Sequence, residues 1–220
     1  MDWKSLLSNH SKDINQHNIL NTNAETGEKA SLFLKNKAVC TQESGYILVE
    51  GPDAEVFLQG QVTCDVSNVV QGASVNGAHL NPQGKVIFSF LLSKLKKGLI
   101  ILDVNKPILA TAMSSLKKYA VFSKVTLSLS ENFYSFLISS KASDDLPKLT
   151  EYSSIQKLSK GIIYSIVPKT LFSKWFDLIK DDITLIHNDT SRYIRINAGL
   201  TDIYPETSSK FIPQVLNYDL

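Results

Sequence analysis

The feature that most restricts the fold of this chain is the run KVIFSFLLSKL at residues 85–95, which is apolar on both faces. A strand with this pattern has to be covered from two sides, by helices on both faces or by helices on one face and another domain on the other. Lys96-Lys97-Gly98 predicts a turn, after which LIILDV at 99–104 returns as a second strand. The first run is therefore expected to be a central strand of a sheet.

Shorter apolar runs around this pair predict further strands and helices. Strands are expected at 31–40, 45–50, 124–130, 133–140, 154–159 and 162–168, and helices after Asp53, Pro107 and Thr170 and over 188–200. Asp53 and Thr170 are the predicted N-caps, and Gly60 is placed to end the first helix in the left-handed conformation. This order favours an α+β fold class with antiparallel sheets backed by helices, which two ferredoxin-like units in tandem would satisfy.

Two local patterns refine this prediction, and one stretch falls outside it. Tyr193, Ile196 and Leu200 lie at helical spacing and predict the apolar side of the last helix. Asn81-Pro82-Gln83-Gly84 suits a type I turn, with proline at its second position and glycine at its fourth. Residues 10–29 are polar and rich in asparagine, and are expected to form a loop or mobile arm.

Charge and cysteine content narrow the class of protein. The formal net charge of +2 gives no case for a dedicated nucleic-acid binder, so no direct nucleic-acid binding is expected. The N-terminus lacks the apolar core of a signal peptide, and no apolar run is long enough to span a membrane. The only cysteines, Cys40 and Cys64, form no CxxC motif. A cytoplasmic location and small, buried cysteines are therefore expected.

Catalytic motifs are absent from the sequence: it contains no GxSxG, no P-loop and no GxGxxG. His79 precedes a turn within an apolar strand, where a histidine is more often structural than catalytic. Asp65 is interpreted as the cap of the next turn. Arg195 lies on an otherwise apolar helix, and a guanidinium in such surroundings generally needs an anionic partner. The residues alone indicate a soluble cytosolic α+β protein that could bind a small anionic ligand.

Four segments, taken together, resemble one known family. They are GPDAEVFLQGQVTCDV at 51–66, AHLNPQGKV at 78–86, LKKYAVFSKV at 116–125, and RINAGLTDIYPETSSKFIPQVLNYDL at 195–220. In this order and at similar spacing they resemble the YgfZ family of folate-binding, tRNA-modifying proteins. The first segment is also similar to the glycine-cleavage T protein, an aminomethyltransferase that uses folate. The resemblance covers roughly residues 30–220.

The resemblance implies a fold, a ligand and a role. It implies tandem folate-binding units of the T-protein type around a channel that holds tetrahydrofolate or a derivative. On this basis the chain divides into an N-terminal arm at 1–29, a first α+β unit at 30–131 and a second, incomplete unit at 132–220. Members of the family support the assembly or repair of iron–sulfur enzymes, including one that modifies tRNA. The expected partners are a folate and an iron–sulfur client enzyme, with no membrane.

Two departures from the family pattern bear on function. Where the T protein carries a carboxylate, this chain has Val86-Ile87-Phe88-Ser89, which supplies no acid, base or anion. The family's KGCYxGQE motif would begin a few residues after Leu220, so the reactive cysteine and the C-terminal β-barrel are expected to be absent. Neither Cys40 nor Cys64 matches that motif. Loss of one pocket wall should weaken folate binding and expose a surface for self-association.

Matching to the family also suggests the ligand-facing side chains. They are Gln61, Thr63, Asp65, Asn81, Lys85, Arg195, Gln214 and Asn217. Lys85 and Arg195 could meet the glutamate tail of folate. The leading hypothesis is a non-catalytic folate-binding accessory protein, with no catalytic residue and no metal site. The alternatives are a folate-dependent aminomethyl or one-carbon transferase and an interaction module without ligand binding.

Overall fold

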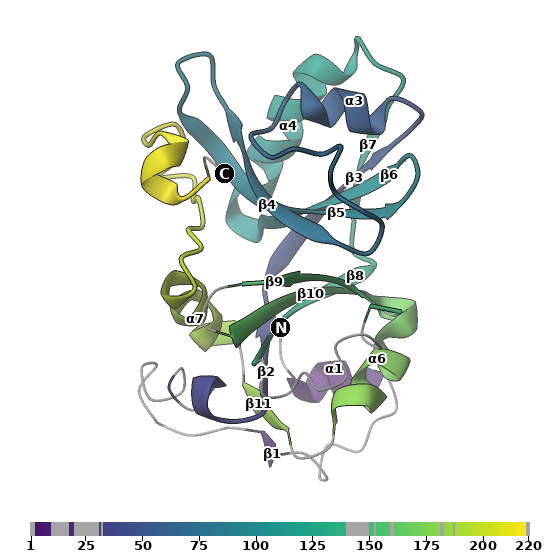
Figure 1. Cartoon of the computed structure of the whole chain (residues 1–220), viewed down its shortest axis with the longest axis vertical. Coiled ribbons are helices and arrows are strands. Elements are labelled where there is room, and N and C mark those ends of the chain that lie inside the picture. Colours follow the sequence, from purple (N-terminus) through teal and green to yellow (C-terminus); the bar gives the residue numbers. More distant parts are fainter. Residues whose placement is uncertain are drawn as a thin grey trace. The chain divides into compact units, whose positions relative to one another are not determined.

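A computed structural model describes residues 3–9, 18–19, 31, 33–139, 150–151, 153–158, 161–180, 183–186 and 188–218 of the 220-residue chain. The chain forms two compact units, each built from two separate stretches of sequence (Figure 1). Unit 1 comprises residues 1–43 and 132–199, and unit 2 comprises residues 44–131 and 200–220. The predicted arm at 10–29 lies outside the described residues, apart from Asn18–Ile19.

Unit 2 is a five-stranded antiparallel sheet in the order β4-β5-β6-β3-β7. Its strands are β3 (Ser44–Glu50), β4 (Ser74–Leu80), β5 (Val86–Lys96), β6 (Leu99–Asn105) and β7 (Thr126–Ser130). The run that is apolar on both faces is β5, and it lies between two neighbours as its pattern predicts.

Two helices cover one face of this sheet (Figure 1). They are α3 (Ala54–Gln59) and α4 (Leu109–Ala120), the second preceded by the 3₁₀ turn η2 (Lys106–Ile108). Alternate strand residues such as Ile47, Val49 and Leu102 point toward them and form one buried core with Phe57 and Leu116. This core fixes the ends of the helices and therefore the loops that follow them.

The last stretch of the chain completes unit 2. The 3₁₀ turn η7 (Pro213–Leu216) and its flanks lie beside the β4–β5 hairpin (Figure 1). Val86 N donates to Phe211 O at 2.8 Å, and Ser209 N donates to Val86 O at 2.7 Å. Leu216 and Tyr218 share a small buried cluster with Val86. Backbone pairing and apolar burial together hold this segment against the hairpin.

Unit 1 is a six-stranded mixed sheet in the order β1-β11-β2-β8-β10-β9. The strands are β1 (Asn18–Ile19), β2 (Ala38–Gln42), β8 (Phe133–Ser139), β9 (Ser154–Lys157), β10 (Ile162–Pro168) and β11 (Thr184–Ile186). The β1–β11 and β11–β2 pairs are parallel, and the other pairs are antiparallel. The sequence did not predict the parallel pairs.

An aromatic cluster fills the core of unit 1. Helices α1 (Trp3–Asn9) and α6 (Phe172–Ile179) pack on the sheet, with η5 (Lys169–Leu171) leading into α6. Phe136 stacks on Trp175 with ring centroids 4.5 Å apart, and Phe172 stacks on Phe176 at 5.6 Å. All four side chains are fully buried.

The division of the chain differs from the sequence-based one at three segments. Residues 1–29 were predicted to be a separate arm, but Leu6 and Leu7 of α1 are buried in the core of unit 1. The other two differences involve strand pairing. Residues 30–43 were placed in the first unit, but β2 pairs with β8 and β11 of unit 1. Residues 200–220 were placed in the second unit, but they pair with β5 and pack against β4 in unit 2. Long-range pairing decides both cases, and local sequence patterns carry no information about it.

Several local predictions were wrong for identifiable reasons. The predicted strand 31–40 is helical at residues 33–35, and β2 begins only at Ala38, where burial becomes continuous. Gly60 is right-handed, with φ −81°, because Gln61 N and Val62 N continue to donate to Leu58 O. Asp53 makes no cap hydrogen bond to α3. Its carboxylate accepts instead from Lys124 N at 2.8 Å.

The two C-terminal helix predictions also need correction. Thr170 lies inside η5 and does not cap α6, whose preceding residue is Leu171. After η6 (Asn188–Thr190), helix α7 (Ser191–Asn197) ends before Leu200 and buries Ile194. Tyr193 and Ile196, the predicted apolar side, are 45% and 61% exposed. A helix of seven residues presents too few turns for spacing alone to identify its buried side.

Within the described ranges, every helix is too short or too polar to span a membrane.

Candidate functional site

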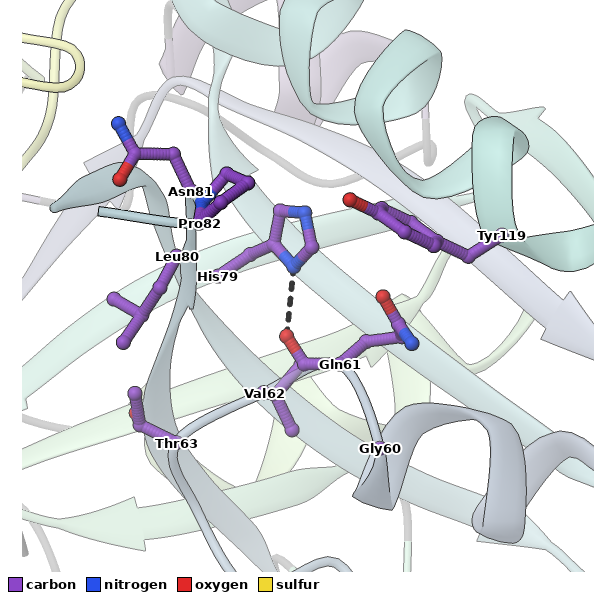
Figure 2. A pocket seen from close by; sticks show the side chains of 9 residues that line it. All are labelled: Gly60, Gln61, Val62, Thr63, His79, Leu80, Asn81, Pro82 and Tyr119. Atoms are coloured by element: carbon purple, nitrogen blue, oxygen red, sulfur yellow. Dashed lines mark hydrogen bonds between the residues drawn. The ribbon is translucent and has the colours of Figure 1, made fainter. Parts of the chain in front are cut away.

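A pocket of about 420 Å³ opens in unit 2 where three segments of the chain meet (Figure 2). Its lining residues are Gly60, Gln61, Val62, Thr63, His79, Leu80, Asn81, Pro82 and Tyr119. They come from the loop after α3, from the end of β4 with its turn, and from the end of α4. The volume lies within the range of about 300–1,000 Å³ that is typical of small-molecule sites.

A short piece of extended chain forms one wall of this pocket. Val62 bridges His79 in antiparallel pairing, and Thr63 N donates to Ala78 O at 3.0 Å. The Thr63 hydroxyl accepts a hydrogen bond from Ala78 N at 3.0 Å. The loop after α3 is therefore attached to β4 by backbone and side-chain bonds, which hold Gln61 and Thr63 at the opening.

The turn after β4 forms a second wall. Gly84 N donates to Asn81 O at 2.9 Å, which confirms the predicted turn, and Gly84 has φ +75°. The Asn81 side-chain oxygen accepts from Gln83 N at 3.0 Å and from Lys85 N at 2.9 Å. In Figure 2 the Asn81 amide points away from the imidazole of His79. Asn81 thus shapes the rim of the pocket by holding the turn.

His79 forms the floor of the pocket and is only 2% exposed. Its Nδ1 lies 2.7 Å from the backbone oxygen of Gln61. Burial lowers the pKa of His79 below its ordinary 6.5, although the bond to the Gln61 carbonyl works in the opposite direction. The imidazole is therefore neutral at pH 7. Because a carbonyl oxygen only accepts, Nδ1 carries the proton and Nε2 carries a lone pair.

Tyr119 stands at the mouth of the pocket, near the end of α4. Its ring lies edge-on to the imidazole of His79, with centroids 6.1 Å apart, and its side chain is 40% exposed. Figure 2 shows its phenol oxygen directed toward the imidazole. On the other side, Phe88 packs against His79 at 5.3 Å. His79 thus lies between a buried ring and a partly exposed one.

The structure groups three of the eight residues expected at the site. Gln61, Thr63 and Asn81 line the pocket. Asp65 does not line it: its carboxylate accepts from Ser67 N and Oγ at 3.0 and 2.6 Å and from Asn68 Nδ2 at 2.6 Å. Those bonds lower the pKa of Asp65, that from the Ser67 hydroxyl most. Asp65 therefore organises its own turn, as its position in the sequence suggests.

The other four expected residues lie elsewhere. Lys85 and Gln214 are exposed in unit 2, outside the pocket lining. Asn217 follows η7 in the left-handed conformation, with φ +60°. Arg195 belongs to unit 1, where its guanidinium lies over the ring of Tyr164 at 5.3 Å. This stacking gives Arg195 a contact that the sequence did not predict.

Sequence reasoning did not predict that His79 and Tyr119 line the same pocket. His79 was interpreted as structural, and its bond to Gln61 O agrees with that, but it also lines the pocket. Tyr119 was noted only as part of the segment LKKYAVFSKV. One signal was available: a histidine two residues before a turn that contains proline and glycine lies near the end of a strand, where loops converge.

Neither cysteine has the properties of a reactive thiol. Burial raises the pKa of Cys64 to about 11, and burial also raises the pKa of Cys40. Neither thiol forms a disulfide, and both are buried. Across the stretches of chain that the structure describes, no group of three or more His, Cys, Asp or Glu side chains could hold a metal ion.

Comparisons with known proteins agree with the resemblance found in the sequence. An uncharacterized protein of Haemophilus influenzae is 34% identical over 174 residues, or 78% of this chain and 56% of that protein. The tRNA-modifying protein YgfZ of an Enterobacter species is 30% identical over 190 residues, or 77% of this chain and 56% of its own length. YgfZ of Aliivibrio fischeri is 29% identical over 182 residues, with 78% and 56% covered. No protein-family model matches the chain.

The structure has a known counterpart as well. The aminomethyltransferase T of the glycine cleavage system from Bartonella henselae superposes with a TM-score of 0.66, covering 86% of this chain and 58% of that one. At 15% identity this likeness shows the fold, which confirms the predicted α+β class of the T-protein type. The chain spans a little over half the length of the curated relatives it matches. Over that shared part, the resemblance found in the sequence is confirmed: the chain is similar to YgfZ tRNA-modifying proteins of several bacteria.

Proposed function

We propose that this chain binds a reduced folate and acts in the cytoplasm as a non-catalytic accessory protein that supports iron–sulfur enzymes, including those that modify tRNA. One observation carries the proposal. All nine lining residues of the pocket come from three of the segments by which the sequence resembles the YgfZ family, 51–66, 78–86 and 116–125. The relatives named as tRNA-modifying proteins support the second part of the proposal.

The chemistry of the pocket suits the pterin part of a folate. A pterin is a flat ring system with N–H donors and ring acceptors along its edges. The pocket offers two aromatic rings, His79 and Tyr119, and the polar side chains of Gln61 and Thr63. Flat apolar surface with a few placed polar groups is the usual composition of such sites. Lys85 is exposed and follows the lining residues Asn81 and Pro82 closely in the sequence. It could attract the anionic tail of folate.

The transferase alternative finds little support in this pocket. None of the nine lining residues carries a carboxylate. At the place where the T protein has its acid, Phe88 is fully buried, and the Ser89 hydroxyl donates to Thr201 O at 3.2 Å. Those side chains contribute packing and a backbone contact and supply no base for aminomethyl transfer. We therefore place the chain among accessory proteins.

Nuclear magnetic resonance with folinic acid, a stable reduced folate, tests the proposal. Titration to millimolar concentration should shift the backbone amide signals of Gln61, Thr63, His79 and Tyr119, because these residues surround the pocket. The melting temperature should rise in parallel, since a ligand that binds only the native state stabilises it. Millimolar ligand ensures that weak binding is also detected.

A matched pair of variants makes the test specific. Gln61→Ala removes a polar lining side chain and should weaken the response to folinic acid. Val70→Ala changes a residue of the same unit that is 68% exposed and outside the lining, and should leave the response unchanged. If no amide signal moves at millimolar folinic acid, the folate proposal is wrong, and an interaction module without ligand binding becomes the better description.

A further inference from the structure

A buried nitrogen at the floor of the pocket lacks a hydrogen bond. His79 Nε2 has almost no contact with solvent, and the residues that the structure describes give it no hydrogen-bond partner. Most buried polar groups in native proteins are paired, because an unpaired one has lost its bonds to water without replacement. Because this side chain, only 2% exposed, also lines the pocket, its unpaired nitrogen points to a partner from outside the protein.

The protonation of His79 fixes what that partner must offer. The bond from Nδ1–H to Gln61 O, at 2.7 Å, leaves Nε2 as an acceptor. Among the nine residues that line the pocket, Tyr119 is the only other one with a titratable side chain, and the ring packed on the opposite side, Phe88, is apolar. No lining side chain carries a charge that would favour the imidazolium. The site therefore requires a donor, an N–H or an O–H.

Tyr119 determines access to this nitrogen. Its ring lies edge-on to the imidazole, with its oxygen directed toward the histidine (Figure 2). The tyrosine is 40% exposed and follows the last buried position of α4, Leu116. Packing restricts a partly exposed ring less than a buried one, so Tyr119 can change its rotamer. Such a rotation would expose Nε2 to the pocket without moving the backbone.

We propose that His79 determines the ligand specificity of this pocket, with Nε2 accepting a hydrogen bond from a ring N–H or amino group of a flat heterocycle once the ring of Tyr119 turns aside. The inference builds on the proposed folate function and adds the group that recognises the ligand. Tyr119 acts as a positioning residue that covers the acceptor in the empty pocket and stacks beside the ligand in the filled one.

The proposal makes a prediction about selectivity. A heterocycle that presents a donor to Nε2 gains one hydrogen bond to a buried acceptor. A heterocycle that presents only acceptors there leaves the nitrogen unpaired and adds repulsion between lone pairs. The difference should be about 5- to 100-fold in affinity, as for other sites built to pair a buried polar group.

Two substitutions of His79 test the roles of its two ring nitrogens separately. In His79→Asn the short amide can still donate to Gln61 O, but nothing reaches the position of Nε2. In His79→Gln the longer amide can place an acceptor near that position and loses the bond to Gln61 O. Titration with folinic acid should show affinity reduced about 5- to 100-fold for His79→Asn and a smaller reduction for His79→Gln. Equal affinity of His79→Asn and the unmodified protein would overturn the proposal.

A direct measurement on the unmodified protein covers the case in which either variant fails to fold. The ¹⁵N chemical shift of His79 Nε2 distinguishes a bare nitrogen from one that accepts a hydrogen bond or is protonated. We expect a bare nitrogen without ligand and a hydrogen-bonded, unprotonated one with folinic acid. If folinic acid shifts the pocket amides but not Nε2, the specificity role is wrong while folate binding stands. If nothing shifts, the folate function itself fails.

Discussion

The two units of this protein use aromatic side chains in opposite ways. In unit 1, Phe136 stacks on Trp175 at 4.5 Å, and neither ring is exposed. In unit 2, His79 and Tyr119 lie 6.1 Å apart, edge to face, and one of them is 40% exposed. Close stacking with full burial serves stability, whereas a looser pair with one free side leaves room for a ligand. Similar residue types thus have different roles in two sheets with helix-covered cores.

Removal of the stacked ring in unit 1 should have the largest effect. Trp175→Ala leaves a cavity in a core where the rings of Phe136 and Phe172 lie 4.5 and 6.0 Å from that of Trp175. We expect the free energy of unfolding to fall by about 3–5 kcal/mol, as for other buried Trp or Phe residues replaced by alanine. Urea denaturation measures the change. Tyr119→Ala, the matched control in unit 2, should lose far less, and equal losses would contradict the comparison.

Close packing behind the pocket gives a second, smaller effect. In Gly77→Ala, the new methyl group would lie 2.8 Å from the Sγ atom of Cys64 and 2.8 Å from the ring of Phe90. Both neighbours are buried and must move, so we expect a loss of about 1–3 kcal/mol in urea denaturation. Gly72→Ala is the control in the same unit. The new methyl group would meet no atom within 4 Å, but Gly72 has φ +80°, so any loss of stability there measures backbone strain alone.

Acid should destabilise the protein through His79. Its pKa is lowered in the folded state by burial, so below pH 6.5 the unfolded chain takes up a proton that the folded chain does not. The stability contributed by the neutral His79 is therefore fully present above pH 6.5. It is lost as the pH falls from 6.5 to the pKa that His79 has in the folded protein. Thermal unfolding between pH 7.5 and 5 should show a steeper loss for the unmodified protein than for His79→Asn. Parallel slopes would mean that His79 is not buried as described.

The smallest effect on stability is expected for the hydroxyl of Tyr119. Tyr119→Phe keeps the ring and should change the free energy of unfolding by less than about 0.5 kcal/mol, as for most partly exposed positions. Binding of folinic acid should persist, because stacking depends on the ring. Tyr119→Ala should weaken that binding, and calorimetry on the two variants compares them. A large stability loss in Tyr119→Phe would indicate that the hydroxyl pairs with Nε2 in the empty pocket.

The sequence predicted the parts of the fold that depend on local pattern. The run at 85–95 correctly identified a central strand, and Pro107 and the apolar stripe after it located α4. Strand order was beyond such reasoning, because β2 pairs with β8 and β11 from the far half of the chain. The same limit explains the wrong assignment of 200–220, whose partners are β4 and β5.

The candidate site was predictable as a set of segments and not as a set of side chains. Three of the four segments that carry the family resemblance meet at one pocket. Asp65 and Asn217 lie in those four segments but serve the backbone, one by bonding its own turn and the other by adopting φ +60°. His79 looked structural because it precedes a turn within an apolar strand, and its bond to Gln61 O agrees with that. Its second nitrogen became informative only when burial and pairing were known atom by atom.

The interleaved division of the chain has a consequence for its biosynthesis. Ser208 reaches the carbonyl of Ile87 across 121 residues, and Ser139 reaches that of Asn36 across 103. A ribosome must therefore release most of the polypeptide before the sheet of unit 1 is complete and before the C-terminal segment packs against β5 of unit 2. Until then, strand edges of the nascent chain remain unpaired. Pairings so distant along the chain are slow to form. We therefore expect newly synthesised chains to depend on chaperones until the C-terminal segment has packed against the β4–β5 hairpin.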